Sequence, residues 1–183
     1  MNGAGVEVRI VPPDINEKAI RTTLQRNSGT TPADIAEVLA RAKAEIVSEV
    51  ERDAVVIGAD QLLELDGEIF EKPDDMEAAR KTILALGGKT HQLHASVAVA
   101  RGGETVWAHT ATAHLTVRAI NPKFVGRYLA EAGEAVLGSV GAYQLEGVGV
   151  HLFSAIKGDY FTILGLPLLP LLDYLRQEGI VAS

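Results

Sequence analysis

The stretch Val55-Val56-Ile57-Gly58-Ala59-Asp60-Gln61 joins a short apolar run to an aspartate. The β-branched residues predict a buried strand over Ala54–Ile57, which Gly58 ends, and we expect Asp60 in the loop that follows. Chemistry is expected to centre on Asp60, because loops at the ends of buried strands present reactive groups. The alternative is that Asp60 only opens a turn, since strand-Gly-x-Asp occurs in many unrelated α/β proteins.

The segments before this strand predict one more strand and one helix. The alternation of apolar and polar residues over Val6–Ile10 predicts a half-exposed strand that ends at Pro12–Pro13. Thr31 suits the N-cap of a helix and Pro32 its first position, so an amphipathic helix is expected over Pro32–Val50.

The segments after the strand predict a mixed α/β fold. Asp66–Gly67 is expected to close a tight hairpin between two short strands, Leu62–Leu65 and Glu68–Phe70. The remaining expected elements are a helix over Met76–Leu86, an antiparallel hairpin of Leu93–Val99 and Trp107–Val117, a helix from Asn121 to near Gly133, an irregular loop over Gly138–Gly149, a strand over Val150–Ile156 and a helix over Leu166–Leu175. Because strands alternate with helices around one long hairpin, we expect a sheet with parallel and antiparallel pairs and flanking helices.

Length and composition limit the classes of protein that this sequence can encode. A chain of 183 residues suits one domain, and 47% hydrophobic with 22% charged residues is typical of a globular protein. The net charge of −7 argues against a nucleic-acid polymer as partner. No apolar run is long enough to cross a membrane and no signal segment precedes the first strand, so a soluble, cytoplasmic protein is expected.

The absence of cysteine limits the chemistry further. With no cysteine in the sequence, disulfides, thiolate catalysis and Cys-ligated metals are excluded, and a metal must be held by oxygen or imidazole. His91 and His94 are three residues apart in an expected strand and therefore point to opposite faces. The spacing of His109 and His114 also places them on opposite faces, so no histidine metal site is expected.

Seven short motifs follow one another along the chain. They are D-x-N-E at Asp14–Glu17, A-x-x-K-A at Ala40–Ala44, G-A-D-Q at Gly58–Gln61, D-G-E-x-x-x-K-P at Asp66–Pro73, G-K-T-H at Gly88–His91, G-A-Y-x-x-E-G at Gly141–Gly147 and G-D-Y-x-x-x-x-G-L-P-L at Gly158–Leu168. In this order they resemble the Maf-like protein family over essentially the whole chain. The resemblance implies a Maf/inosine-triphosphatase-like fold, a homodimer, and pyrophosphatase activity that converts a nucleoside triphosphate and water to a monophosphate and pyrophosphate with Mg²⁺ or Mn²⁺.

Several residues supply what hydrolysis at an α-phosphorus needs. The resemblance makes Asp60 the proton acceptor, and the carboxylates of Glu17 and Asp60 are the candidate metal ligands, because Mg²⁺ prefers oxygen. Lys72 is fixed by the following proline and is expected to face phosphate, and Lys43 is a second candidate for substrate binding. The alternatives are that Glu17 is a solvated turn acid and that both lysines are ordinary surface residues.

Two positions are expected to select the nucleotide. In the resembling family these are the residue after the catalytic aspartate and the residue before the late glycine, here Gln61 and Glu146. Glutamine and glutamate match the branch that resembles 7-methyl-GTP pyrophosphatases, whereas the branch that resembles dTTP/UTP pyrophosphatases has threonine and glutamine. A carboxylate accepts from the N1–H and amine of guanine and attracts the cationic methylated ring. The alternatives are that Glu146 pairs with a lysine or arginine, that the substrate is dTTP or UTP, and that the chain is a non-catalytic nucleotide-binding regulator of septum formation.

The resembling chains normally begin with an apolar strand and an S-x-S-x-R-R-like loop. This sequence starts after both, so either its start codon was assigned too late or the protein is naturally shortened. Arginine grips phosphate with a bidentate fork that lysine does not replace. We therefore expect the chain as written to be weakly active or inactive, and less stable than a version extended upstream.

Overall fold

The computed structural model describes residues 1–182, apart from the side chain of Asn2. The chain forms two compact units. The first contains residues 1–60, residues 95–111 and the segment from Gly165 onward, and the second contains residues 61–94 and 112–164. The prediction of a single domain stays a prediction. No helix within the described residues is long and apolar enough to cross a membrane.

The strands of the described residues form one sheet of five in the order β2-β1-β3-β4-β5. Their bounds are Val56–Leu65 for β1, Glu68–Phe70 for β2, Thr90–Arg101 for β3, Glu104–Val117 for β4 and Phe153–Lys157 for β5. The hairpin of β1 and β2 pairs Leu63 with Phe70 across the predicted Asp66–Gly67 turn. At the other edge, β5 pairs Leu115 of β4 with Ile156, with an irregularity in the register after Thr116.

The predicted mixture of parallel and antiparallel pairs is wrong, because the sheet is antiparallel throughout. The prediction took the alternation of strands and helices as a sign of parallel crossovers. Here the helix α3 (Met76–Leu86) follows the outer strand β2, which already runs opposite to β1, and the chain then enters β3 antiparallel to β1. A tight turn joins β3 to β4 and requires opposite directions, whereas β5 pairs antiparallel to β4 after the long connection of residues 118–152.

The predicted break at Gly58 is also wrong. The strand β1 continues from Val56 to Leu65, and Asp60 lies inside it rather than in a loop. Gly58 is needed for a different reason: a Cβ there would overlap the carbonyl oxygen of Ala40 and lie 2.6 Å from the amide nitrogen of Ala44. The glycine therefore allows close approach of a helix to the strand.

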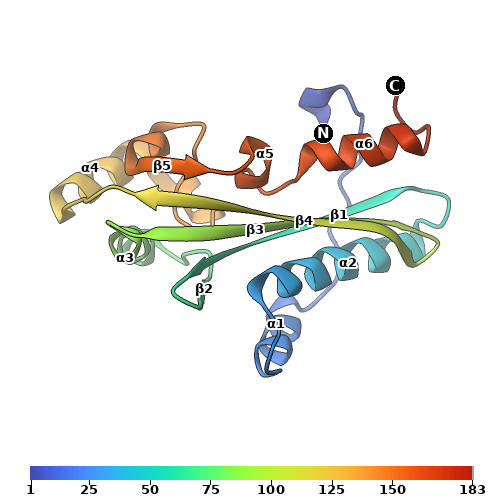
Figure 1. Ribbon diagram of the computed structural model, residues 1–183, viewed down its shortest axis with the longest axis horizontal. Helices are drawn as coiled ribbons and strands as arrows, with labels where there is room; N and C mark the ends of the chain where they lie inside the picture. The colour runs from blue at the N-terminus through green and yellow to red at the C-terminus, as the bar shows by residue number, and fades with distance from the viewer. Residues whose placement is uncertain (183) are drawn as a thin grey trace. The chain divides into compact units, whose positions relative to one another are not determined.

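The first unit places helices on both faces of its strands. The helix α2 (Pro32–Val50) has the predicted bounds and begins with a capping box between Thr31 and Asp34. Its small residues pack on one face of β3, whereas α6 (Leu168–Gln177) packs on the opposite face, as Figure 1 shows. The two contact sets are Ala40, Ala44, Ala98 and Ala100 on the α2 side and Val97, Val99, Leu171 and Leu175 on the α6 side.

The N-terminal segment differs from its prediction. After the short 3-10 helix η1 (Asn2–Ala4), residues 6–16 form neither helix nor strand, so the strand expected over Val6–Ile10 is wrong. Ile10 is 86% exposed, so it does not pack into a core. A segment with alternating apolar residues forms a strand only where it can pair with a neighbouring strand or pack against a core. A helix that the sequence analysis missed, α1 (Glu17–Gln25), follows and is capped by the side chain of Asn16.

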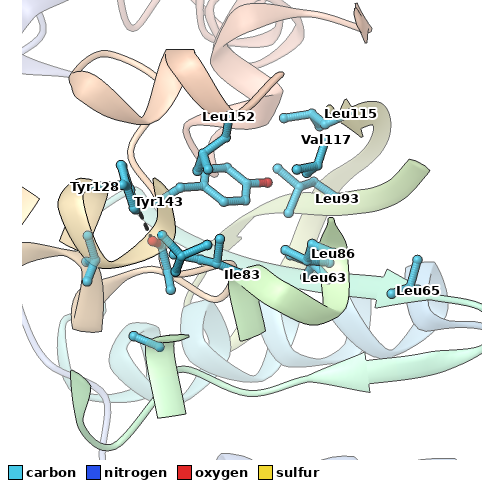
Figure 2. Close-up of a cluster of buried hydrophobic side chains, with 14 of the residues drawn as sticks. Leu63, Leu65, Ile83, Leu86, Leu93, Leu115, Val117, Tyr128, Tyr143 and Leu152 are labelled. Carbon is cyan, nitrogen blue, oxygen red and sulfur yellow. Dashed lines mark hydrogen bonds between the residues drawn. The ribbon is translucent and has the colours of Figure 1, made fainter. Parts of the chain in front are cut away.

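The second unit is built around a large apolar cluster (Figure 2). It is enclosed by α3, whose N-cap is Asp75, and by α4 (Pro122–Ala132), which begins at Asn121 and ends at Gly133 as predicted. The loop expected over Gly138–Gly149 is bounded by the 3-10 helices η2 (Gly133–Gly138) and η3 (Val148–Leu152). A short helix, α5 (Tyr160–Ile163), completes the unit.

The close approach at Gly58 yields a first prediction. Gly58→Ala is expected to lower the free energy of unfolding by about 1–3 kcal/mol, because the added methyl group meets helix backbone that cannot rotate away. Urea unfolding monitored by circular dichroism measures the effect. The matched control is Gly138→Ala, whose Cβ would meet nothing within 4 Å. Equal midpoints for the two variants would contradict the argument.

Burial of His91 yields a second prediction. Burial lowers the pKa of His91 to about 4, so between this pH and 6.5 the unfolded chain binds a proton that the folded chain does not. Stability is therefore lost as the pH falls through this window, by about 2 kcal/mol between pH 7 and pH 4.5. Denaturant unfolding at both pH values measures this loss, which should be smaller in His91→Phe. An identical loss in that variant would show that other groups cause it.

Candidate active site

Three of the predicted site residues come together in the first unit. The ammonium of Lys43, in the middle of α2, lies 2.7 Å from Oδ1 of Asp60 in β1 and 3.0 Å from Oε1 of Glu17 at the start of α1. One cation thus bridges two carboxylates. The chain segments that supply the three residues are far apart in sequence, so tertiary packing alone joins them.

Asp60 is the most buried member of this triad of Glu17, Lys43 and Asp60. Its side chain is 8% exposed, compared with 17% for Lys43 and 44% for Glu17. Within the described residues, Oδ2 of Asp60 is buried and has no hydrogen-bond partner. A buried carboxylate oxygen normally has a partner, so this atom is available to a proton, a water molecule or a cation.

The charges of the triad affect one another. Burial raises the pKa of Asp60, the hydrogen bond and charge of Lys43 oppose the rise, and Glu17 adds to it. Burial lowers the pKa of Lys43, but its hydrogen bonds to the two carboxylates outweigh burial and the pKa is raised. Lys43 therefore stays positively charged, and the raised pKa of Asp60 suits a group that accepts a proton during a reaction.

These contacts bear on the alternatives for Glu17 and Lys43, whose roles in binding stay predictions. Lys43 is largely buried and paired, so it is not an ordinary surface lysine. Glu17 occupies the first turn of a helix and contacts Lys43, so it is not simply a solvated turn acid. The helix that positions Glu17 could have been found in the sequence, because Asn16 is a favourable N-cap and Ile20 and Leu24 are four residues apart.

The carboxylates of the triad can also supply some of the ligands of a divalent metal. No group of three or more histidine, aspartate or glutamate side chains within residues 1–182 is arranged to bind a metal. Two carboxylates do contact the same ammonium group here, and Oδ2 of Asp60 is free of protein partners in the part of the chain that the structure describes. Mg²⁺ needs only one or two protein carboxylates when water and substrate phosphates supply the other ligands, so Glu17 and Asp60 fit such an ion.

Gln61 lies in the second unit, and its amide nitrogen is already engaged. The Nε2 atom donates to the carbonyl oxygens of Thr162 and Ile163, both at 3.0 Å. A glutamine side chain has two N–H donors and one carbonyl oxygen, so only Oε1 remains to contact a nucleotide. Gln61 therefore also holds the end of α5, a role that the sequence did not reveal.

Lys72 and Glu146 are both exposed residues of the second unit. Lys72 follows β2, and Glu146 lies in the turn before η3. In the described part of the chain neither side chain has an ion-pair partner, so the proposed pairing of Glu146 with a lysine or arginine is not observed. Both side chains remain available to a ligand.

Comparison with known proteins gives the class of this chain. The family model described as Maf-like protein matches residues 1–178, and the chain belongs to this family. A protein of Brucella abortus named 7-methyl-GTP pyrophosphatase is 53% identical over 178 residues, which cover 97% of this chain and 89% of the relative. A protein of Mesorhizobium japonicum with the same name is 52% identical over the same shares of the two chains. A protein of Granulibacter bethesdensis named nucleoside triphosphate pyrophosphatase is 47% identical over 96% of this chain and 88% of its own length.

The engagement of Gln61 yields a third prediction. In Gln61→Glu a carboxylate oxygen replaces the amide nitrogen and faces two carbonyl oxygens, so the free energy of unfolding should fall by about 1–3 kcal/mol at pH 7. Thermal unfolding measures the change. The control is Gln144→Glu, because Gln144 is exposed and makes a single 3.4 Å bond to the carbonyl oxygen of Ala135. An equally small effect of both substitutions would mean that Gln61 does not hold α5.

Proposed function

We propose that this chain is a nucleoside triphosphate pyrophosphatase that hydrolyses 7-methyl-GTP to 7-methyl-GMP and pyrophosphate. Membership of the Maf-like family and the relatives that are about half identical support the class of reaction. In the structure, the observation that carries the proposal is the buried Asp60, whose Oδ2 has no partner within the described residues while Lys43 holds its other oxygen.

Asp60 takes the role of general base in this reaction. It removes a proton from a water molecule, whose oxygen forms a bond to the α-phosphorus while the bond from that phosphorus to the bridging oxygen of the β-phosphate breaks. The proton passes to Oδ2, and pyrophosphate leaves. Burial raises the pKa of Asp60 and makes the carboxylate a better proton acceptor, while Lys43 keeps its other oxygen fixed in place.

Positive charge near the phosphates supports the same chemistry. Lys43 stays charged between its two carboxylates, and Lys72 is exposed and free to reach a phosphate. Glu17 and Asp60 would hold Mg²⁺ or Mn²⁺, which when bound offsets negative charge on the phosphate oxygens. The proposal includes that turnover depends on such a metal and that the chain as written is weakly active.

Glu146 and Gln61 are proposed to select the base. The carboxylate of Glu146 is exposed and, within the described residues, unpaired, so it can accept two hydrogen bonds from the edge of guanine and attract the positive charge of a 7-methylated ring. Gln61 can offer only its carbonyl oxygen, which is an acceptor as well. Two acceptors suit the donor-rich edge of guanine better than that of uracil or thymine.

The first test of the proposal measures pyrophosphate release with Mg²⁺ or Mn²⁺ from 7-methyl-GTP, GTP, UTP and dTTP. Asp60→Asn is expected to lower kcat by about 10²–10⁴-fold, because the amide cannot accept the proton of water. Nucleotide binding, measured by calorimetry, should remain. The matched control is Asp53→Asn at an exposed turn. Undiminished turnover in Asp60→Asn would remove Asp60 from the reaction. No turnover of any nucleotide, either by the chain as written or by a version extended upstream, would favour a binding protein.

The base preference is tested separately. Glu146→Gln is expected to reduce the ratio of kcat/KM for 7-methyl-GTP to that for UTP by about tenfold or more, because a neutral amide loses a charge-assisted hydrogen bond to the cationic base. Glu131→Gln, at an exposed position of α4, serves as the control. A ratio that stays at the wild-type value in both variants would show that Glu146 does not contact the base.

A further inference from the structure

The loop that carries Glu146 has close internal contacts and one strained residue. We call residues 138–149 the glycine loop. A Cβ on Gly141 would overlap the ring of Tyr143, and one on Gly149 would overlap the carbonyl oxygen of Gln144. Ala142 has a φ of 55°, in the left-handed region that costs energy for any residue but glycine. Such a conformation persists only where the surroundings impose it.

A buried hydrogen bond imposes it from the core. The Nε2 atom of His91, in β3, lies 2.6 Å from the hydroxyl of Tyr143. His91 is 0% exposed and Tyr143 is 6% exposed. The ring of Tyr143 lies in the apolar cluster of the second unit (Figure 2) and contacts the edge of Phe153, with ring centres 4.8 Å apart. Tyr143 therefore anchors the glycine loop inside the core, three positions before Glu146.

A second hydrogen bond supports the same loop. The hydroxyl of Tyr128, in α4, donates to the carbonyl oxygen of Ala142 at 3.2 Å, the bond that is dashed in Figure 2. The strained alanine is thus itself bonded to α4, and the next residue, Tyr143, is bonded to β3. The glycine loop is attached to β3 through His91 and to α4 through Tyr128, so its exposed turn is carried on two rigid elements.

The pair of His91 and Tyr143 stabilises the core less than two apolar side chains would. Within the described residues, the Nδ1 atom of His91 is buried and has no hydrogen-bond partner, which costs stability relative to an apolar side chain. Burial keeps His91 neutral, with its pKa lowered to about 4, and raises the pKa of Tyr143 far above its usual value. Neither group changes its protonation state near neutral pH. The pair therefore serves to hold the glycine loop in place and takes no part in acid–base chemistry.

We propose that His91 and Tyr143 are positioning residues that fix the glycine loop so that Glu146 meets the base of the nucleotide. This inference rests on the proposed function, since it concerns the same choice of base. It also links the motifs G-K-T-H and G-A-Y-x-x-E-G, because their histidine and tyrosine are the two partners of one hydrogen bond.

The test begins with Tyr143→Phe, which keeps the packed ring and removes only the hydroxyl. Its kcat/KM for 7-methyl-GTP should fall by about tenfold, mainly through a higher KM, while kcat/KM for UTP changes by less than about threefold. The matched control is Thr112→Val, which removes another imidazole–hydroxyl hydrogen bond, that of His94 at 3.0 Å, with no connection to the glycine loop. The control should keep the wild-type ratio.

Three further measurements separate positioning from mere stability. Tyr143→Phe in a Glu146→Gln background should change the base preference no further, because the residue it positions is gone. Amide hydrogen exchange of residues 144–149 should become faster in Tyr143→Phe and stay unchanged in Thr112→Val. The double variant His91→Phe with Tyr143→Phe removes both polar partners, so it should recover stability without recovering the preference.

The outcomes distinguish this inference from the proposed function. Unchanged exchange of the glycine loop in Tyr143→Phe overturns the inference, and so does faster exchange with an intact preference for 7-methyl-GTP. Failure of the proposed function has another signature, because the wild-type chain itself would then show no preference for 7-methyl-GTP. Faster exchange together with a lost preference, both absent in the control, supports the inference.

Discussion

The ion pair between Lys43 and Asp60 is the interaction on which the candidate active site depends. A carboxylate buried in a strand is unfavourable unless a cation compensates it, and Lys43 supplies that charge from the facing helix at 2.7 Å. The pairing is possible only because Gly58, two residues earlier in β1, lets the backbone of α2 approach the strand closely. Glu17 completes the triad from α1, which links three separate segments through one ammonium group. One oxygen of Asp60 is thereby held, and the other has no hydrogen-bond partner within the described residues.

The second unit uses a different physical principle. Its candidate recognition residues are fixed by neutral hydrogen bonds and close packing rather than by charge. Gln61 gives both amide hydrogens to backbone carbonyls, and Glu146 stands on a loop whose neighbour Tyr143 is tied to buried His91. Neutral contacts of this kind hold a shape over a wide pH range, and within the described residues they leave the carboxylate of Glu146 without an ion-pair partner.

The errors of the sequence predictions have identifiable causes. A glycine inside an apolar run indicates a break when only local conformation is considered. Gly58 instead continues the strand and leaves room for the backbone of α2, which packs against it. The apolar alternation at Val6–Ile10 resembles a strand, yet a strand needs a partner that the pattern does not specify. Parallel pairing was inferred from alternating elements, although the short outer strand β2 reverses the chain before the helix α3.

The sequence by itself determined the elements whose signals are local: the capped helices α2, α3 and α4, the tight turn at Asp66–Gly67, the long hairpin and the ordered motifs that resemble one family. Caps, turns and hydrophobic periods act within a few residues, so they can be read along the chain. Only the tertiary structure decided the antiparallel sheet, the triad of Glu17, Lys43 and Asp60, and the bond of His91 to Tyr143. These depend on which surfaces meet in the folded chain, and burial leaves an oxygen of Asp60 and a nitrogen of His91 without a hydrogen-bond partner within the described residues.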